Sequence, residues 1–226
     1  VIAPAPAGSY LDAVAREPGP LRIGLITTPV THSAVDPECA QAAATAAKLC
    51  ESLGHRVTEV QLPVDPQAFF AATGVIMGIG NVLRVKDREQ QLGREVTRDD
   101  LEPVTWHYYQ RNKTITGEQL ARARITLGET AARMAELQQN VDILLSPTMA
   151  KTPVKLGKMQ LNQEVADFEQ EAIHASAFTM LYNGTGQPAM SVPLHWTPDG
   201  LPVGVMFAAR YGDETTLYQL AGQLEQ

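Results

Sequence analysis

The sequence predicts an α/β fold with a mixed β-sheet flanked by helices. Residues 21–62 resemble a strand, a helix and a second strand, a unit that normally places its two strands in parallel. Near the end of the chain, apolar stretches at 189–194 and 203–208 flank Pro198-Asp199-Gly200, which is typical of an antiparallel hairpin. Parallel and antiparallel pairs in one chain together indicate a mixed sheet.

The helix of the first unit has clear start and stop signals. Asp36 followed by Pro37 is typical of an N-cap and first helical position, and Gly54 suits the position just past the helix end. Its predicted core stripe consists of small side chains that allow close docking on a sheet: Cys39, Ala43, Ala46, Cys50 and Leu53. In one helix the two cysteines would lie about 16 Å apart, too far for a disulfide. Buried thiols fit a reducing compartment, so we expect a cytoplasmic protein.

The middle of the chain reads as helical. Residues 68–86 are apolar and contain Gly78-Ile79-Gly80, which lacks the preceding strand and third glycine of a dinucleotide-binding loop. A short helix is expected over 97–109, and Thr116 with Gln119 forms a capping box that opens a long helix to residue 137. Its predicted buried stripe is Leu120, Ala123, Leu127, Met134 and Leu137.

The last third alternates strands and helices. A buried strand at 142–145 ends at Ser146-Pro147, and a loop rich in Lys, Pro and Gly follows to residue 158. Helices are expected over 164–181 and 215–224, on either side of the hairpin. The Pro- and Ala-rich opening predicts a linker or extended segment over 1–20, with the folded part at 21–226. An opening Val1 in place of Met favours an excised or processed piece.

Composition argues against several function classes. The formal net charge is -7 and basic residues form no run, so we expect no nucleic-acid partner. No stretch of about 18 uninterrupted apolar residues occurs, so we expect no membrane span, and no signal peptide is apparent at the start. The five histidines show no metal-ligand spacing, and neither a P-loop nor a GxSxG elbow occurs.

Six serines are possible nucleophiles in principle. A serine hydroxyl needs an adjacent base and an oxyanion hole before it can attack a carbonyl. Ser146 lies at a strand end and Ser191 lies inside a strand, and the sequence places no base beside either. We therefore expect structural roles for both.

Several segments, in order along nearly the whole chain, resemble the C-terminal half of the amidase signature family. The most specific part runs from Phe178 to Pro193 and contains Asn-Gly-Thr-Gly-Gln-Pro-Ala-Met-Ser-Val-Pro at 183–193; the resemblance continues through 198–207. The string Val-Asp-Ile-Leu-Leu-Ser-Pro-Thr at 141–148 is similar to a strand end of that family. Weaker matches lie at 7–25, 35–39 and 53–57. The resemblance implies the C-terminal part of the amidase signature fold, over residues 21–226.

Members of this family are serine hydrolases that cleave amide bonds with a Ser–cis-Ser–Lys triad. The triad and oxyanion loop lie in a Gly/Ser-rich stretch of the N-terminal half, and this chain has neither a Ser-Ser nor a Gly-Gly pair. No catalytic residue can therefore be assigned here. Lys151, Lys155 and Lys158 lie in a Pro-rich loop and are expected to be solvated.

What the resemblance implies for this chain is a pocket wall. Its candidate substrate-binding residues are Thr148, Met149, Asn183, Thr185, Met77 and Trp106. For each of them the alternative is plain packing or turn formation. The resemblance implies hydrolysis of a small-molecule carboxamide with no metal and no organic cofactor.

The resemblance also implies a partner. In the family one sheet runs through both halves, so this chain would expose a sheet edge and an apolar face. We expect the N-terminal half of the same enzyme to cover them, as a linked or separate chain, with self-association into a homo-oligomer as a further possibility. The alternative function is a non-catalytic binding or scaffold module, or an amidotransferase-type subunit, that retains the fold.

Overall fold

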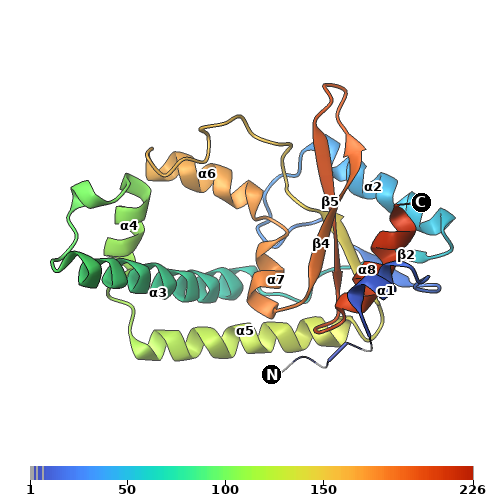
Figure 1. Cartoon of the computed structure of the whole chain (residues 1–226), viewed down its shortest axis with the longest axis horizontal. Coiled ribbons are helices and arrows are strands. Elements are labelled where there is room, and N and C mark those ends of the chain that lie inside the picture. The colour runs from blue at the N-terminus through green and yellow to red at the C-terminus, as the bar shows by residue number, and fades with distance from the viewer. Residues whose placement is uncertain (1–2, 4, 7, 226) are drawn as a thin grey trace. The chain divides into compact units, whose positions relative to one another are not determined.

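Five strands form one mixed sheet in a computed structural model that describes residues 3, 5–6 and 8–225 (Figure 1). Their spatial order is β2-β1-β3-β5-β4. β1 pairs in parallel with β2 and β3, whereas β5 is antiparallel to β3 and β4. The predicted mixed α/β fold is therefore confirmed. The strands are β1 (Arg22–Leu25), β2 (Arg56–Glu59), β3 (Ile143–Pro147), β4 (Ala189–Trp196) and β5 (Pro202–Ala209).

The helices of the described chain fall close to the predicted positions, with the exceptions discussed below. They are α1 (Tyr10–Val14), α2 (Pro37–Ser52), α3 (Pro66–Leu92), the 3₁₀ turn η1 (Arg98–Asp100), α4 (Pro103–Asn112), α5 (Gly117–Leu137), α6 (Val165–Ala175), α7 (Met180–Thr185) and α8 (Glu214–Leu224).

The chain divides into two compact units. The first comprises residues 1–64, 131–153 and 174–226 and holds the whole sheet. The second comprises residues 65–130 and 154–173 and is helical. The sheet therefore lies in only one of the two units. The helical unit is formed by two segments that are far apart in sequence.

The core of the first unit lies where α2 and α8 cover one face of the sheet. Ile23, Ile143 and Phe207 of the three central strands are fully buried and point to this face, as alternate residues of a strand must. α2 contributes the predicted small side chains, including Cys39 and Cys50, which are buried and free. Burial raises the pKa of each thiol to about 11, so both stay protonated at neutral pH.

The ends of α2 follow the predicted signals. The Asp36 side chain accepts a hydrogen bond from the Glu38 N–H at 2.9 Å, and Pro37 is the first helical residue. Gly54 follows the C-terminal cap with φ 92°, in the left-handed region that glycine adopts without strain. Sequence signals of this kind depend only on neighbouring residues, which is why they predict helix ends well.

The second unit is built on α3, which is longer than predicted. Gly78 lets α4 approach, because a Cβ at this position would lie 2.7 Å from the Asn112 side chain. α3 is long and apolar enough to span a membrane by length and composition, but core helices of soluble proteins meet the same criteria. Met77 and Leu83 are exposed on it, at 65% and 58%. The helix thus carries apolar side chains that the described residues leave uncovered.

Two segments differ from expectation. The single helix predicted over 164–181 is two helices, α6 and α7, separated by turns at 176–179 where no Gly or Pro marks a break. Within the stretch 1–20, expected to be extended, the structure has α1, which packs against α8. Ser9 caps it by accepting from the Leu11 N–H, and Gly222 allows the contact because a Cβ there would meet the Val14 carbonyl oxygen. Residues 1–2, 4 and 7 of that stretch lie outside the described residues.

Asp142 links the start of β1 and of β3 to the end of β5. Its carboxylate accepts hydrogen bonds from the Arg22 side chain at 2.8 and 3.1 Å and from the Arg210 guanidinium at 2.6 Å. It also accepts from the Arg22 backbone N–H at 2.9 Å. The hydrogen bonds from Arg22, together with the two positive charges, lower the pKa of Asp142 to about 2. One carboxylate therefore bridges residues that flank β1, β3 and β5.

Replacing this carboxylate should destabilise the sheet. We expect Asp142→Asn to reduce the free energy of unfolding at pH 7 by about 1–2 kcal/mol, because charge-assisted hydrogen bonds are lost but the arginines are half exposed. Urea unfolding followed by circular dichroism measures this.

The same contribution should depend on pH. Because the folded pKa of Asp142 lies below its ordinary value of 3.8, its stabilisation is complete above that value and is lost as the pH falls toward 2. The stability difference between the wild-type protein and Asp142→Asn should therefore shrink between pH 4 and pH 2. A difference that stays constant over this range would contradict the assigned role of the carboxylate.

Candidate functional site

A cavity of about 280 Å³ lies against the face of the sheet opposite α2 and α8. Ser191 of β4 and Met206 of β5 are register partners and both line it. The turn after β3 contributes Thr148, and the region of α7 contributes further side chains. The full lining is Thr148, Thr179, Tyr182, Asn183, Gln187, Ala189, Met190, Ser191 and Met206.

Two hydroxyl groups form one wall of this cavity. The hydroxyls of Thr148 and Ser191 are hydrogen-bonded at 2.6 Å, and the Thr148 N–H donates to the Gly204 carbonyl at 3.0 Å. A Cβ at Gly204 would lie 2.6 Å from Ser191 Oγ and 2.9 Å from Thr148 Oγ1. Position 204 must therefore be glycine for the two hydroxyls to meet.

Asn183 brings an exposed carboxamide to the cavity from α7. The segment 183–186, expected to be a loop, is instead the end of α7, and Gly186 terminates it with φ 76°. The Gly186 N–H donates to the Tyr182 carbonyl at 2.8 Å, which closes the last turn. The helix end thus fixes where the Asn183 amide can donate and accept hydrogen bonds.

Behind the cavity runs a buried chain of polar side chains. The Thr185 hydroxyl lies 3.1 Å from the Leu181 carbonyl and 2.8 Å from Gln187 Oε1, both within donating distance. The Gln187 amide donates to the Gln138 side chain, and the Gln138 backbone carbonyl accepts from Arg210 Nε at 2.9 Å. Thr185 therefore supports the cavity from behind, through Gln187, and does not line it.

The electrostatics of the cavity are those of neutral groups. Burial raises the pKa of the Tyr182 phenol well above its usual range, so the phenol stays protonated. Ser146 is buried and its hydroxyl donates to the Pro147 carbonyl at 2.9 Å. Among the described residues, no cluster of three or more His, Cys, Asp or Glu side chains could hold a metal ion.

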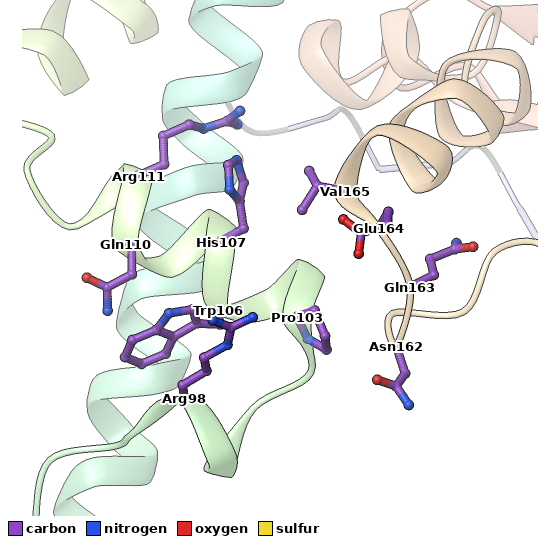
Figure 2. Close-up of a pocket in the computed structure, with 10 residues that line it drawn as sticks. All are labelled: Arg98, Pro103, Trp106, His107, Gln110, Arg111, Asn162, Gln163, Glu164 and Val165. Carbon is purple, nitrogen blue, oxygen red and sulfur yellow. The ribbon is translucent and has the colours of Figure 1, made fainter.

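The predicted site residues separate into two groups. Thr148 and Asn183 line the same cavity, and Met149 is the half-buried residue that follows Thr148. Met77 and Trp106 belong to the second unit: Met77 is exposed on α3, and Trp106 lines a separate cavity shown in Figure 2. Whether any of these residues contacts substrate stays a prediction.

Sequence reasoning missed three groups that complete the cavity, namely Ser191, Tyr182 and Gln187. Ser191 was expected to be structural because no base could be placed beside it. The alternation of β4 could have identified it as facing the same side as Ala189, but its partner across the hairpin depends on the register of β5.

The mixed five-stranded sheet and its flanking helices match the fold of solved amidase signature enzymes. The model of the Amidase family matches residues 2–218, so the chain belongs to that family.

Three comparisons place the chain more closely. It is similar to the 6-aminohexanoate-cyclic-dimer hydrolase of Paenarthrobacter ureafaciens, with 31% identity over 99% of this chain and 47% of the relative. A solved structure of 6-aminohexanoate cyclic dimer hydrolase aligns with a TM-score of 0.86 and 30% identity, over 100% of this chain and 48% of that one. A putative amidase, AmiC, of Mycobacterium leprae is 33% identical over 91% of this chain and 43% of its own length. The chain thus spans about half the length of the relatives it matches.

The close approach at Gly204 gives a direct test of the site geometry. We expect Gly204→Ala to separate the Thr148 and Ser191 hydroxyls and to destabilise the protein by about 1–3 kcal/mol, because the added methyl group overlaps both. Thermal and urea unfolding measure the loss.

Gly128 supplies the matched control. It lies within α5, and a Cβ there meets nothing within 4 Å. Gly128→Ala should stabilise the helix by roughly 0.5–1 kcal/mol, because alanine loses less backbone entropy than glycine on folding. Equal effects of the two substitutions would show that crowding at position 204 is not the cause.

Proposed function

We propose that this chain forms the substrate-facing wall of a carboxamide hydrolase whose nucleophile lies on a segment outside these 226 residues. The observation that carries the proposal is the cavity on the second sheet face, where Thr148 and Asn183 present polar groups beside apolar Met206. A site that orients a small ligand typically combines apolar walls with a few such groups.

The relatives support this division. The chain belongs to the amidase family but spans only 47% of the 6-aminohexanoate-cyclic-dimer hydrolase that it resembles. Hydrolysis of an amide needs a nucleophile, a base and an oxyanion hole. Under the proposal, a Ser–cis-Ser–Lys triad and its oxyanion loop supply these from the part of the enzyme that corresponds to the rest of the relatives' length.

The groups of this chain would then act by positioning. The Asn183 carboxamide can donate to the carbonyl and accept from the N–H of a substrate amide. The Thr148 hydroxyl, held by Ser191 at 2.6 Å, can present its remaining hydrogen-bonding capacity to the acyl side. Met149 and Thr185 would shape the pocket from behind. The carboxylate product and the ammonia or amine leave without a metal or organic cofactor.

The chain would work with a partner that supplies the other half of the enzyme. β2 and β4 are the edges of the sheet in the described chain, and β4 is eight residues long. Unpaired edges and the exposed apolar side chains of α3 are surfaces that a partner would cover. Two free, buried cysteines fit a reducing compartment, so we place the protein in the cytoplasm.

Complementation tests the proposed division of the enzyme. The purified chain should not be labelled by a serine-directed fluorophosphonate probe, and adding an N-terminal fragment built on the relatives should restore both labelling of that fragment and amide hydrolysis. Labelling of a serine on this chain would contradict the proposal. A stable complex with no activity toward any amide would instead favour a scaffold role.

Dye binding and size-exclusion chromatography test the proposed interface with the N-terminal half. We expect this chain alone to bind a hydrophobic dye and to self-associate in size-exclusion chromatography, because its apolar α3 side chains are uncovered. Dye binding should fall when the N-terminal fragment is added, and Met77→Gln with Leu83→Gln should weaken that assembly. A monodisperse monomer that binds little dye would count against the partner.

Substitutions in the cavity test the positioning role. In the assembled enzyme, Thr148→Val and Asn183→Ala should each lower kcat/KM by about tenfold, as expected when one hydrogen bond to the substrate is lost. Asn140→Ala, at an exposed position outside the cavity, is the matched control and should leave kcat/KM unchanged. Unaltered kinetics for both cavity variants would remove Thr148 and Asn183 from the proposed wall.

A further inference from the structure

The second unit contains its own cavity, of about 880 Å³, between α4 and the start of α6 (Figure 2). One wall comes from η1 and α4, and the other from residues 162–165. All of its lining residues lie within this one unit: Arg98, Pro103, Trp106, His107, Gln110, Arg111, Asn162, Gln163, Glu164 and Val165. The cavity is therefore a feature of the unit itself.

Two sets of contacts hold the walls in place. The Val104 N–H donates to the Leu161 carbonyl at 3.2 Å near the start of α4. One turn further along, the Tyr108 hydroxyl donates to Glu169 at 2.9 Å, and the guanidinium of Arg111, a turn beyond Tyr108, lies 3.7 Å from the same carboxylate. Burial, with the Glu169 hydrogen bond, raises the pKa of Tyr108 to about 12, so this donor keeps its proton. These contacts join the two walls of the cavity at two positions along α4.

The cavity presents one free positive and one free negative charge. Within the part of the chain that the structure describes, neither Arg98 nor Glu164 makes a side-chain hydrogen bond or an ion pair. Arg98 belongs to the η1 wall, whereas the Glu164 carboxylate points into the cavity from the opposite wall (Figure 2). The charge of Arg111 is already balanced by Glu169.

These charges restrict the ligand. A phosphate-like dianion would meet one free guanidinium but also an unpaired carboxylate, so it is disfavoured. A ligand with a carboxylate at one end and an ammonium at the other would pair with both groups. The Pro103 and Val165 side chains and the Trp106 indole also line the cavity, and they offer apolar surface to a hydrocarbon spacer.

We propose that this cavity binds a small aliphatic zwitterion, with its carboxylate on Arg98 and its ammonium on Glu164. The inference does not rest on the proposed hydrolysis, because it requires no nucleophile and no partner chain. The sequence nominated Trp106 for the wall of the amide site. The proposal assigns this residue to a separate binding site instead.

Titration of the purified chain with 6-aminohexanoate, followed by nuclear magnetic resonance, tests the proposal. The chain has two tryptophans, Trp106 in the cavity and Trp196 on β4, so the two indole N–H signals give a reporter and an internal reference. We expect only the Trp106 signal to shift. Hexanoate and hexylamine, each carrying one of the two charges, should bind about tenfold or more weakly, because one charge-assisted contact is lost.

Charge variants separate the two contacts. Arg98→Gln and Glu164→Gln should each weaken 6-aminohexanoate binding about tenfold, and Arg124→Gln, an exposed arginine of α5 outside the cavity, should have no effect. Arg98→Glu should abolish binding, and combining it with Glu164→Arg should restore it with the ligand reversed. Circular dichroism spectra that match the wild-type spectrum keep these comparisons independent of folding.

Three results would overturn the proposal. Binding of hexanoate as tight as that of 6-aminohexanoate, unaffected by Glu164→Gln, would show a simple anion site. Unchanged binding in Arg98→Gln would remove the carboxylate contact. A shift of the Trp196 signal with none at Trp106 would place the ligand elsewhere on the chain.

Discussion

The bridging carboxylate of Asp142 is the interaction on which the sheet geometry depends. It joins Arg22, at the start of β1, to Arg210, at the end of β5, and it stands directly before β3. The register of β3 against its two neighbours is therefore fixed at one end by charge. At the other end of the same strand lies Thr148. Its N–H donates to the Gly204 carbonyl and its hydroxyl is hydrogen-bonded to that of Ser191, so both contacts depend on the same register. The charged contacts of Asp142 thus lie at one end of the buried strand β3, and the neutral cavity lies at its other end.

Much of the fold could be predicted because its signals are local. Asp36, Pro37 and Gly54 determine the ends of α2 through their own backbone preferences, and Thr116 with Gln119 does the same for the start of α5. The break at 176–179 carries no such signal. α1 was missed for a different reason: a five-residue helix is unstable alone and is held by packing on α8, which is over two hundred residues away in sequence.

The candidate site was harder to predict, because its geometry depends on pairing across the sheet. Thr148 and Asn183 could be nominated from the strand end and the glycine-rich segment, but Ser191 could be assigned only once β4 and β5 were in register. The cavity of the second unit was missed altogether. Arg98 and Glu164 are separated by 66 positions in the sequence, and neither has a motif that would connect them.

The two cavities differ in whether their polar side chains already have hydrogen-bond or ion-pair partners. At the sheet, the Ser191 hydroxyl is hydrogen-bonded to Thr148, and the buried Ser146 hydroxyl, which does not line the cavity, donates to the carbonyl of the next residue. A nucleophilic serine needs its proton directed at a base, and this engagement supports the proposal that the nucleophile comes from another segment. In the helical unit, Arg98 and Glu164 are instead uncommitted among the described residues and face one gap. Opposite charges that line a cavity without pairing with each other remain available to a ligand, whereas Arg111 already pairs with Glu169.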